Sequence, residues 1–258
     1  MRDVLIEDAS AGRALSCFVV DSHCHLGECP FTVIDPSVEA LLRAMDRCGI
    51  DAAVVSSTPG CLAGRIPEGN DEVIEAVKRH GDRIFGLISI DPYRPQKSLD
   101  ELKRCRDAGL RAIKVHDHVG VKYDDAAYEF AWRFANEHGW PILAHTWGSE
   151  TLERLKGHFK TYPSVKWILA HAGSADRNAY ADVAKEYDNV HLELAFSRSP
   201  RRLVEYFVEA GLADRVLHGS DAVFMDAAAQ LGRVVFAEIA LADKMKILGE
   251  NARRVWGL

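Results

Sequence analysis

The sequence predicts an α/β protein, a (β/α)₈ TIM barrel formed by one domain over residues 1–258, with its core starting at about residue 17. Three observations predict this fold. Short runs rich in Val, Ile, Leu and Ala alternate along the chain with stretches of helical periodicity. The strand candidates are apolar on both faces, which is typical of a parallel sheet covered on both sides. Eight such units in 258 residues match the size of a barrel.

The elements follow one another without a linker or a shift in composition. Residues 1–16 form a short addition before the first strand. The strand candidates share an apolar, β-branched character and lie at 17–22, 52–57, 84–90, 110–116, 141–145, 165–171, 190–195 and 215–220. The helix candidates between them lie at 36–48, 69–80, 96–108, 124–138, 149–160, 176–187, 199–210 and 227–238.

Start and stop signals agree with these elements. Pro36 stands at a predicted helix start, while Gly49 and Gly139 stand where helices should end. The last segment, 241–258, predicts an amphipathic helix that covers the outside of the barrel. An open doubly wound sheet is the alternative architecture, and no Gly-x-Gly-x-x-Gly turn favours it.

Composition and charge exclude several classes of protein. The formal net charge of −6 argues against broad nucleic-acid binding, which needs basic patches. No apolar run is long enough to span a membrane, and the first residues lack the apolar core of a secretory signal. The 6 cysteines contain no Cys-x-x-Cys pair, which predicts reduced thiols and a cytoplasmic protein. The expected partner is a small molecule, and a homo-oligomer is compatible with the sequence.

Polar side chains gather at the predicted carboxyl ends of the strands, where barrel enzymes hold their active sites. His23 and His25 are two residues apart in a strand, so both should project from the same face. Cys24 should face the other way and pack behind the strand. The other strand ends carry polar residues of metal-binding or acid–base type, namely Lys114, His116, His145, His171 and Asp221.

These residues predict a metal centre with His23, His25, His145 and Asp221 as ligands and an open position for water. Three imidazoles and a carboxylate favour Zn²⁺, and Mn²⁺, Fe²⁺, Co²⁺ and Ni²⁺ are chemically compatible. One ion is favoured over two. Asp221 can also accept the proton of a metal-activated water, and His171 is the expected catalytic acid–base group.

Other polar residues have more than one interpretation. Lys114 either binds a substrate carboxylate, pairs with a structural acid, or is carboxylated and bridges two metals. His116 is either a substrate contact or structural, and His118 is expected on the surface. Trp147 and Arg198 follow strands and are candidate substrate contacts, although a solvated arginine is the simpler interpretation of Arg198.

Two acidic residues are expected to support the ligands. Asp21 should orient a ligand histidine from behind. Glu193 either hydrogen-bonds a ligand from inside the barrel or is a paired structural glutamate.

Taken together, several motifs resemble the amidohydrolase superfamily, specifically its amidohydrolase-related (amidohydrolase 2) family. The motifs share the family's order along residues 17–258 and include Asp21-Ser-His-Cys-His-Leu-Gly27, Gly109-Leu-Arg-Ala-Ile-Lys-Val-His116, Ile142-Leu-Ala-His145, Ile168-Leu-Ala-His-Ala-Gly173 and His218-Gly-Ser-Asp221. The resemblance implies a distorted TIM barrel with one or two metal ions, the four ligands above, and His171 as the catalytic histidine. One departure is Asp117, which stands where family members often have Pro.

The favoured function is therefore metal-dependent hydrolysis of an amide, ester or lactone bond in a small carboxylate-bearing molecule. Non-oxidative decarboxylation of a small aromatic acid is the alternative, but similar decarboxylases tend to be longer than this compact chain. A deoxyribonuclease resembling the TatD group is disfavoured, because the chain has Lys-Val-His and Gly-Ser-Asp where that group has glutamates. Nothing in the sequence favours a non-catalytic sensor.

Overall fold

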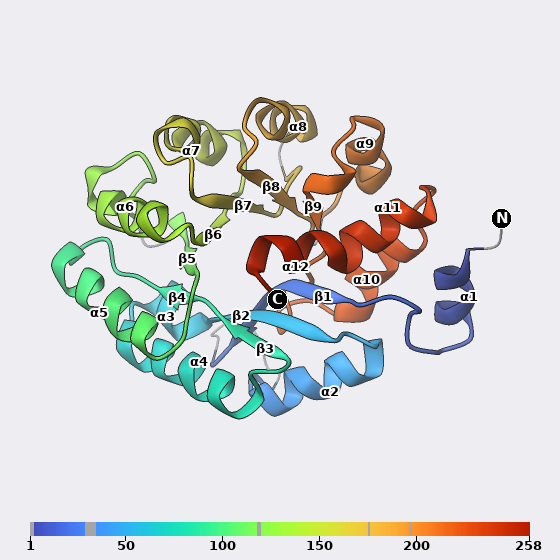
Figure 1. Cartoon of the computed structure of the whole chain (residues 1–258), viewed down its shortest axis with the longest axis horizontal. Helices are drawn as coiled ribbons and strands as arrows, with labels where there is room; N and C mark the ends of the chain where they lie inside the picture. Colours follow the sequence, from blue (N-terminus) through green and yellow to red (C-terminus); the bar gives the residue numbers. More distant parts are fainter. Residues whose placement is uncertain (1–2, 29–34, 118–119, 175, 197) are drawn as a thin grey trace.

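The computed structural model describes residues 3–28, 35–117, 120–174, 176–196 and 198–258. Parallel strands surround a common centre, and helices form an outer ring around them (Figure 1). Two sheets contribute, one in the order β1-β2-β3 and one in the order β4 to β9. The strands of the described residues are β1 (Val20–Leu26), β2 (Ala52–Ser57), β3 (Ile84–Gly86), β4 (Ile88–Ser89), β5 (Ile113–Val115), β6 (Pro141–His145), β7 (Lys166–Ala170), β8 (Val190–Glu193) and β9 (Val216–Leu217).

The predicted strand at 84–90 is divided into β3 and β4, because it changes partners at Leu87. The Leu87 amide donates to the Val55 carbonyl at 2.8 Å, whereas the Ile88 amide donates to the Ala112 carbonyl at 2.9 Å. The side chain of Asn70 then accepts from the Ser89 amide at 2.8 Å, in place of a neighbouring strand. The division therefore leaves no unpaired amide at Ser89.

A seam between β1 and the segment after β9 closes the ring of strands. The Ser22 amide donates to the His218 carbonyl at 3.0 Å, and the Asp221 amide donates to the His23 carbonyl at 2.7 Å. Cys24 and Ala222 form a parallel bridge further along. The predicted barrel is confirmed, and residues from the two ends of the chain meet at this seam.

The helices match the predicted periodic segments, with ends that differ by a few residues. They are α2 (Val38–Cys48), α4 (Ile66–His80), α5 (Pro95–Asp107), α6 (Glu129–His138), α7 (Ser149–Thr161), α8 (Arg177–Glu186), α9 (Leu203–Glu209) and α10 (Ala227–Val235). Two α-helices of the described residues were not expected, α1 (Val4–Ser10) and α3 (Thr58–Ala63). Asp3 caps α1 and pairs with Lys244 at 2.5 Å, which ties the N-terminal addition to the barrel.

The C-terminal segment forms α11 (Leu241–Met245), a π-helical turn at Lys246–Glu250, and α12 (Asn251–Trp256). The prediction that it covers the outside of the barrel is wrong for α12, which lies across the centre of the ring (Figure 1). Ala252 and Val255 pack with interior residues such as Val20 and Ala52, which begin their strands. The helix therefore closes the amino-terminal end of the barrel, opposite the predicted site.

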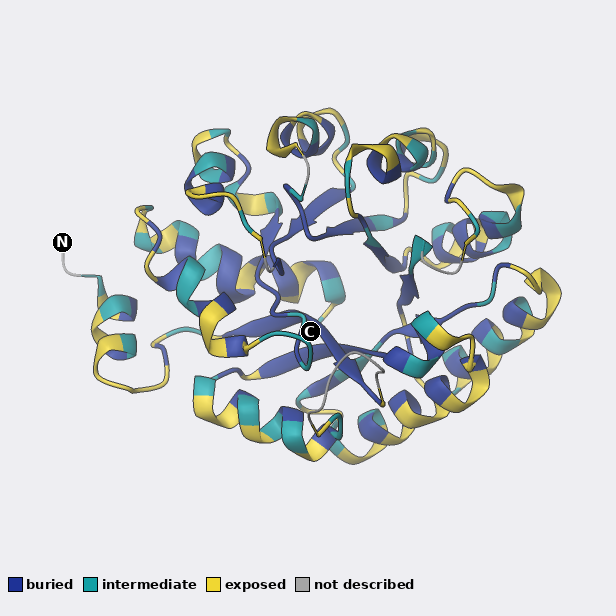
Figure 2. Ribbon diagram, turned by 180° about the vertical axis from the view of Figure 1, so that it is seen from behind, coloured by how far each residue is buried: buried dark blue, intermediate teal, exposed yellow. Residues whose placement is uncertain are grey.

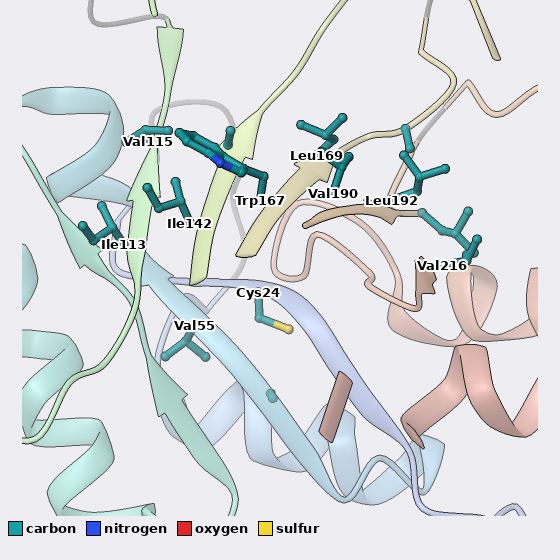
Figure 3. Close-up of a cluster of buried hydrophobic side chains, with 14 of the residues drawn as sticks. Cys24, Val55, Ile113, Val115, Ile142, Trp167, Leu169, Val190, Leu192 and Val216 are labelled. Carbon is teal, nitrogen blue, oxygen red and sulfur yellow. The ribbon is translucent and has the colours of Figure 1, made fainter. Parts of the chain in front are cut away.

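The main core lies between the strands and the helices. Figure 2 shows buried strands, and helices that expose only their outer faces. Outward-facing residues of several strands, such as Val55, Ile142 and Trp167, form this layer (Figure 3). Cys24 is also fully buried there, as expected. Among the described helices, none has the length and apolar character that a bilayer span requires.

Candidate metal centre

An extra residue in β1 aims both histidines into the barrel. Asp21 pairs with Ala53 and Cys24 with Val55, so β1 uses one residue more than β2 over this stretch. Such a bulge redirects side chains locally. His23 and His25 lie with their Nε2 atoms 3.2 Å apart, and both rings are buried. Ser56 of β2 contacts His25 Nδ1 at 3.2 Å, which leaves Nε2 facing the centre.

Asp221 completes a compact donor set. Its backbone has a φ of 61°, a left-handed conformation that non-glycine residues rarely adopt. Its Oδ1 lies 3.1 Å from His25 Nε2 and 3.6 Å from His23 Nε2. Burial alone would raise the pKa of Asp221, but the two nearby histidines outweigh burial and hold the pKa below its usual value. Asp221 is therefore an ionised carboxylate.

Glu193 orients His23, a predicted ligand, as the first of its two predicted roles requires. Its Oε2 lies 2.9 Å from His23 Nδ1, so Nδ1 carries the proton and Nε2 keeps its lone pair. Glu193 also accepts from the amides of His171 and Ala195. Gly219 permits this approach, because a Cβ there would lie 2.8 Å from Glu193 Cδ and 3.0 Å from His23 Cβ.

Asp21 hydrogen-bonds backbone amides, and within the described residues it has no hydrogen bond to the ring of a predicted ligand histidine, unlike the role predicted for it. Its Oδ1 accepts from the His23 amide at 3.2 Å and from the Ser220 amide at 2.8 Å. Asp21 therefore joins the two chain segments that carry His23 and Asp221.

Lys114 lies directly beside the centre. Its side chain is buried, with Nζ 2.8 Å from His23 Nε2, and burial lowers its pKa. Among the described residues, no ion pair joins Lys114 to a carboxylate. The described residues therefore provide no acidic partner for the structural ion pair that was one of the predicted roles of Lys114.

His171 lies between the two histidines of β1 and His145. It has a φ of 59°, and its Nδ1 donates to the Ala195 carbonyl at 2.6 Å. Its Nε2 therefore faces the interior, 3.2 Å from His145 Nδ1. The centroids of the His171 and His23 rings are 5.0 Å apart. This position fits the acid–base role predicted for His171.

His145 is less close to the centre than predicted. Its ring stacks on His116, with centroids 3.7 Å apart and planes inclined by 17°. Among the described residues, its ligand atoms group with those of His116 and Asp117, while His23, His25 and Asp221 form a separate group. The structure thus brings three of the four predicted ligands together and places the fourth beyond His171. Burial, followed by the nearby His116, holds the pKa of His145 well below its usual value.

The candidate substrate contacts differ in position. Trp147 is 45% exposed, and its ring meets Phe196 with centroids 4.9 Å apart and His171 with centroids 5.6 Å apart. Arg198 is exposed, with no hydrogen bond or ion pair to another described residue. His118 lies outside the described residues.

Sequence reasoning missed the side chain that holds the loop after β8. Arg233 of α10 is partly buried and donates to the Leu194 carbonyl at 2.8 Å and to Ser199 Oγ at 2.6 Å. This loop carries the Ala195 carbonyl that His171 uses, and also Phe196. An arginine on a helix gives no sequence signal for such a contact, because the partner carbonyl could belong to any residue.

The donor set fits a divalent cation. Ligand atoms of His23, His25 and Asp221 all lie within 4.8 Å of one another. Burial lowers the pKa of both histidines, which keeps the imidazoles neutral and their lone pairs available. Two neutral imidazoles and one ionised carboxylate are ligands that Zn²⁺ and similar ions accept.

Comparisons with known proteins place the chain among relatives. The model of the amidohydrolase family matches residues 20–258. Gamma-resorcylate decarboxylase of Rhizobium radiobacter is 24% identical over 285 positions, covering 84% of this chain and 86% of that protein. The crystal structure of 2,6-dihydroxybenzoate decarboxylase from Rhizobium has a TM-score of 0.78 and 20% identity, covering 93% of this chain and 99% of that chain.

A third relative was crystallised with a metal. This dihydroxybenzoic acid decarboxylase from Polaromonas sp. JS666 contains manganese and the inhibitor 2-nitroresorcinol. Its TM-score is 0.75 at 21% identity, covering 94% of this chain and 97% of that chain.

Proposed function

Because the chain belongs to the amidohydrolase family, we propose that it is a metal-dependent decarboxylase that removes CO₂ from a small hydroxylated aromatic acid. The observation that carries the proposal is the extent of the match to the three relatives above, all decarboxylases, of which the chain covers 86%, 99% and 97%. In the sequence analysis the short length of the chain favoured a hydrolase over a decarboxylase. Because the chain spans nearly the whole length of these decarboxylases, its length is no reason to exclude their reaction.

The proposed centre holds one divalent ion through His23, His25 and Asp221, with His145 as the expected fourth ligand. Bound there, the ion supplies Lewis-acid polarisation of substrate oxygens. Zn²⁺ is our first expectation from the histidine-rich donor set, and Mn²⁺ is the ion of the Polaromonas relative.

His171 is the proposed proton donor. When the bond between the ring and the carboxylate breaks, its electron pair stays on the ring carbon, which must then take up one proton as CO₂ leaves. His171 has its Nδ1–H bound to the Ala195 carbonyl, and its Nε2 points into the site. A proton held at Nε2 can therefore be delivered to the ring carbon and regained from solvent. Asp221, as an ionised carboxylate, is suited to bind the metal and not to donate this proton.

An aromatic wall supports an aromatic substrate. Trp147 and Phe196 meet edge to face beside His171, and much of Trp147 remains exposed. Aromatic side chains bind flat ligands through apolar contact and favourable ring geometry. This wall would hold a substrate ring next to the metal and the proton donor.

The proposed location is the cytoplasm. Among the described residues no disulfide bond joins the cysteines, namely Cys17, Cys24, Cys48, Cys61 and Cys105. Reduced thiols are typical of proteins in a reducing compartment.

A labelling experiment in D₂O tests the reaction. Purified protein, loaded separately with Zn²⁺ or Mn²⁺, is incubated with 2,6-dihydroxybenzoate, and both CO₂ release and the product are measured. The proposal expects one CO₂ per product and one deuterium at the carbon that lost the carboxylate. A parallel panel of lactones, esters and amides tests hydrolysis. Turnover in that panel, without CO₂ release from any hydroxylated aromatic acid, would contradict the proposal and restore the hydrolase.

A further inference from the structure

A buried lysine shares its hydrogen-bond acceptor with the candidate metal. Lys114 Nζ lies 2.8 Å from His23 Nε2, and its side chain is only 1% exposed. His23 Nδ1 is bound to Glu193, so Nε2 holds the only free lone pair of this ring. The same atom faces His25 and Asp221 and belongs to the compact donor set.

One lone pair cannot serve both Lys114 and a cation. Once His23 Nε2 binds a metal, Lys114 loses this acceptor, and among the described residues no carboxylate is paired with it. A buried amine that lacks an acceptor is unfavourable. The metal-loaded protein therefore has a buried hydrogen-bond donor that needs an oxygen from elsewhere.

The neighbouring strand offers a second free donor. Ser89 of β4 is in register with Lys114 of β5, and partner residues in parallel strands project to the same side of a sheet. The Ser89 hydroxyl is buried and has no hydrogen-bond partner among the described residues. A lysine and a hydroxyl side by side suit an anionic oxygen, because both donate hydrogen bonds and the lysine adds charge.

We propose that Lys114, assisted by Ser89, forms an anion subsite beside the metal centre that binds an ionised carboxylate of the substrate. The choice of an aromatic carboxylate rests on the proposed function, whereas the subsite follows from the contacts of Lys114. It selects carboxylates over uncharged analogues of the same shape. Lys114 also competes with the metal for His23, so removing its amine should tighten metal binding.

The test uses Lys114→Met, which keeps the length of the side chain without the amine. Binding of 2,6-dihydroxybenzoate and of its carboxamide to Mn²⁺-loaded protein is measured by calorimetry, and metal content and affinity are measured separately. We expect the variant to keep its metal with equal or higher affinity and to bind the carboxylate roughly 10- to 100-fold more weakly. Binding of the carboxamide should change less than threefold. Ser89→Ala should also weaken binding of the carboxylate more than binding of the carboxamide, but by a smaller factor than Lys114→Met does.

A control and the opposing outcomes complete the test. Lys244→Met removes another buried lysine, which binds Asp3 and the Val235 carbonyl far from the centre. This variant should bind the carboxylate and the carboxamide as wild type does. Loss of metal in Lys114→Met, or a second metal equivalent that disappears with it, would overturn the subsite in favour of a carboxylated lysine ligand. Equal weakening of both ligands, or wild-type protein that does not prefer the carboxylate to its carboxamide, would also overturn it. If the subsite behaves as expected but no CO₂ is released, the proposed reaction fails while the subsite stands.

Discussion

Glu193→Gln should weaken binding of a divalent cation about 10- to 100-fold, as is typical when a partner of a metal-binding histidine is lost. The Glu193 carboxylate accepts from His23 Nδ1 at 2.9 Å, from the His171 amide at 3.4 Å and from the Ala195 amide. A glutamine has only one oxygen. If it faces His23, its NH₂ group faces the Ala195 amide, and two donors then oppose each other.

The expected magnitude follows from these contacts. A buried donor left without an acceptor costs about 1–3 kcal/mol, and a 10- to 100-fold change in affinity corresponds to about 1.4–2.7 kcal/mol. Glutamine also removes the negative charge that makes His23 a better ligand. The two effects act in the same direction, so a loss smaller than tenfold would be surprising.

The assay is competition between the protein and a fluorescent chelator for Mn²⁺ or Zn²⁺, with unfolding in urea as a check on the fold. Glu205→Gln is a matched control, because Glu205 is also buried but accepts from the Glu238 amide on the outer face of the barrel. A folded Glu193→Gln variant with metal affinity within threefold of wild type would refute the reasoning. Equal losses in the two variants would assign the effect to general destabilisation.

Three further predictions concern the site and the barrel. Asp221→Ala should lose the metal, whereas His171→Ala should keep most of the metal and lose turnover. Elemental analysis measures the metal content of each variant. Metal loss in His171→Ala would make His171 a ligand. Burial, followed by Arg215, lowers the pKa of His191 to about 3 from 6.5, so only the unfolded chain takes up this proton as the pH falls below 6.5. This contribution to the free energy of unfolding is present above pH 6.5 and is lost towards pH 3, by up to about 1.4 kcal/mol per pH unit. Urea unfolding between pH 7 and 4.5 should therefore show a smaller loss of stability for His191→Leu than for wild type. Equal losses of stability in the two proteins would contradict the argument. Gly219→Ala should destabilise the protein by about 1–3 kcal/mol, because the added Cβ would contact Glu193. Gly157→Ala should stabilise α7 slightly, because a Cβ there meets nothing within 4 Å. Equal melting temperatures for the two variants would disprove the close approach of Glu193 to Gly219.

Much of the fold could be predicted because the barrel repeats one local pattern. Apolar strands and amphipathic helices alternate, and this periodicity located the strands and most helices to within a few residues. The division between β3 and β4 could not be predicted, because it depends on which strands are neighbours at Leu87. The placement of α12 also depends on tertiary packing, since an apolar face does not reveal which end or side of the barrel it covers.

The site was predictable where backbone geometry determines side-chain direction. His23, His25 and Asp221 converge because strand ends of a closed barrel converge. His145 illustrates the limit, since its strand position was correct while its ring direction depends on stacking with His116. The contact between Lys114 and His23 joins strands that are not neighbours in the sheets, so no spacing in the sequence could indicate it.

The seam between β1 and the segment after β9 links metal binding to folding of the whole chain. His23 and Asp221 are joined across it by a backbone hydrogen bond, so the donor set exists only after the ring has closed. A cation that binds only the closed form stabilises it by about 2.7 kcal/mol at a concentration 100 times its dissociation constant. The amide hydrogens of Ser22 and Asp221, which cross the seam, should therefore exchange with solvent more slowly as metal is added. A bound metal would then stabilise the junction between the first strand and the segment after the last strand, which can form only when both ends of the strand order have come together.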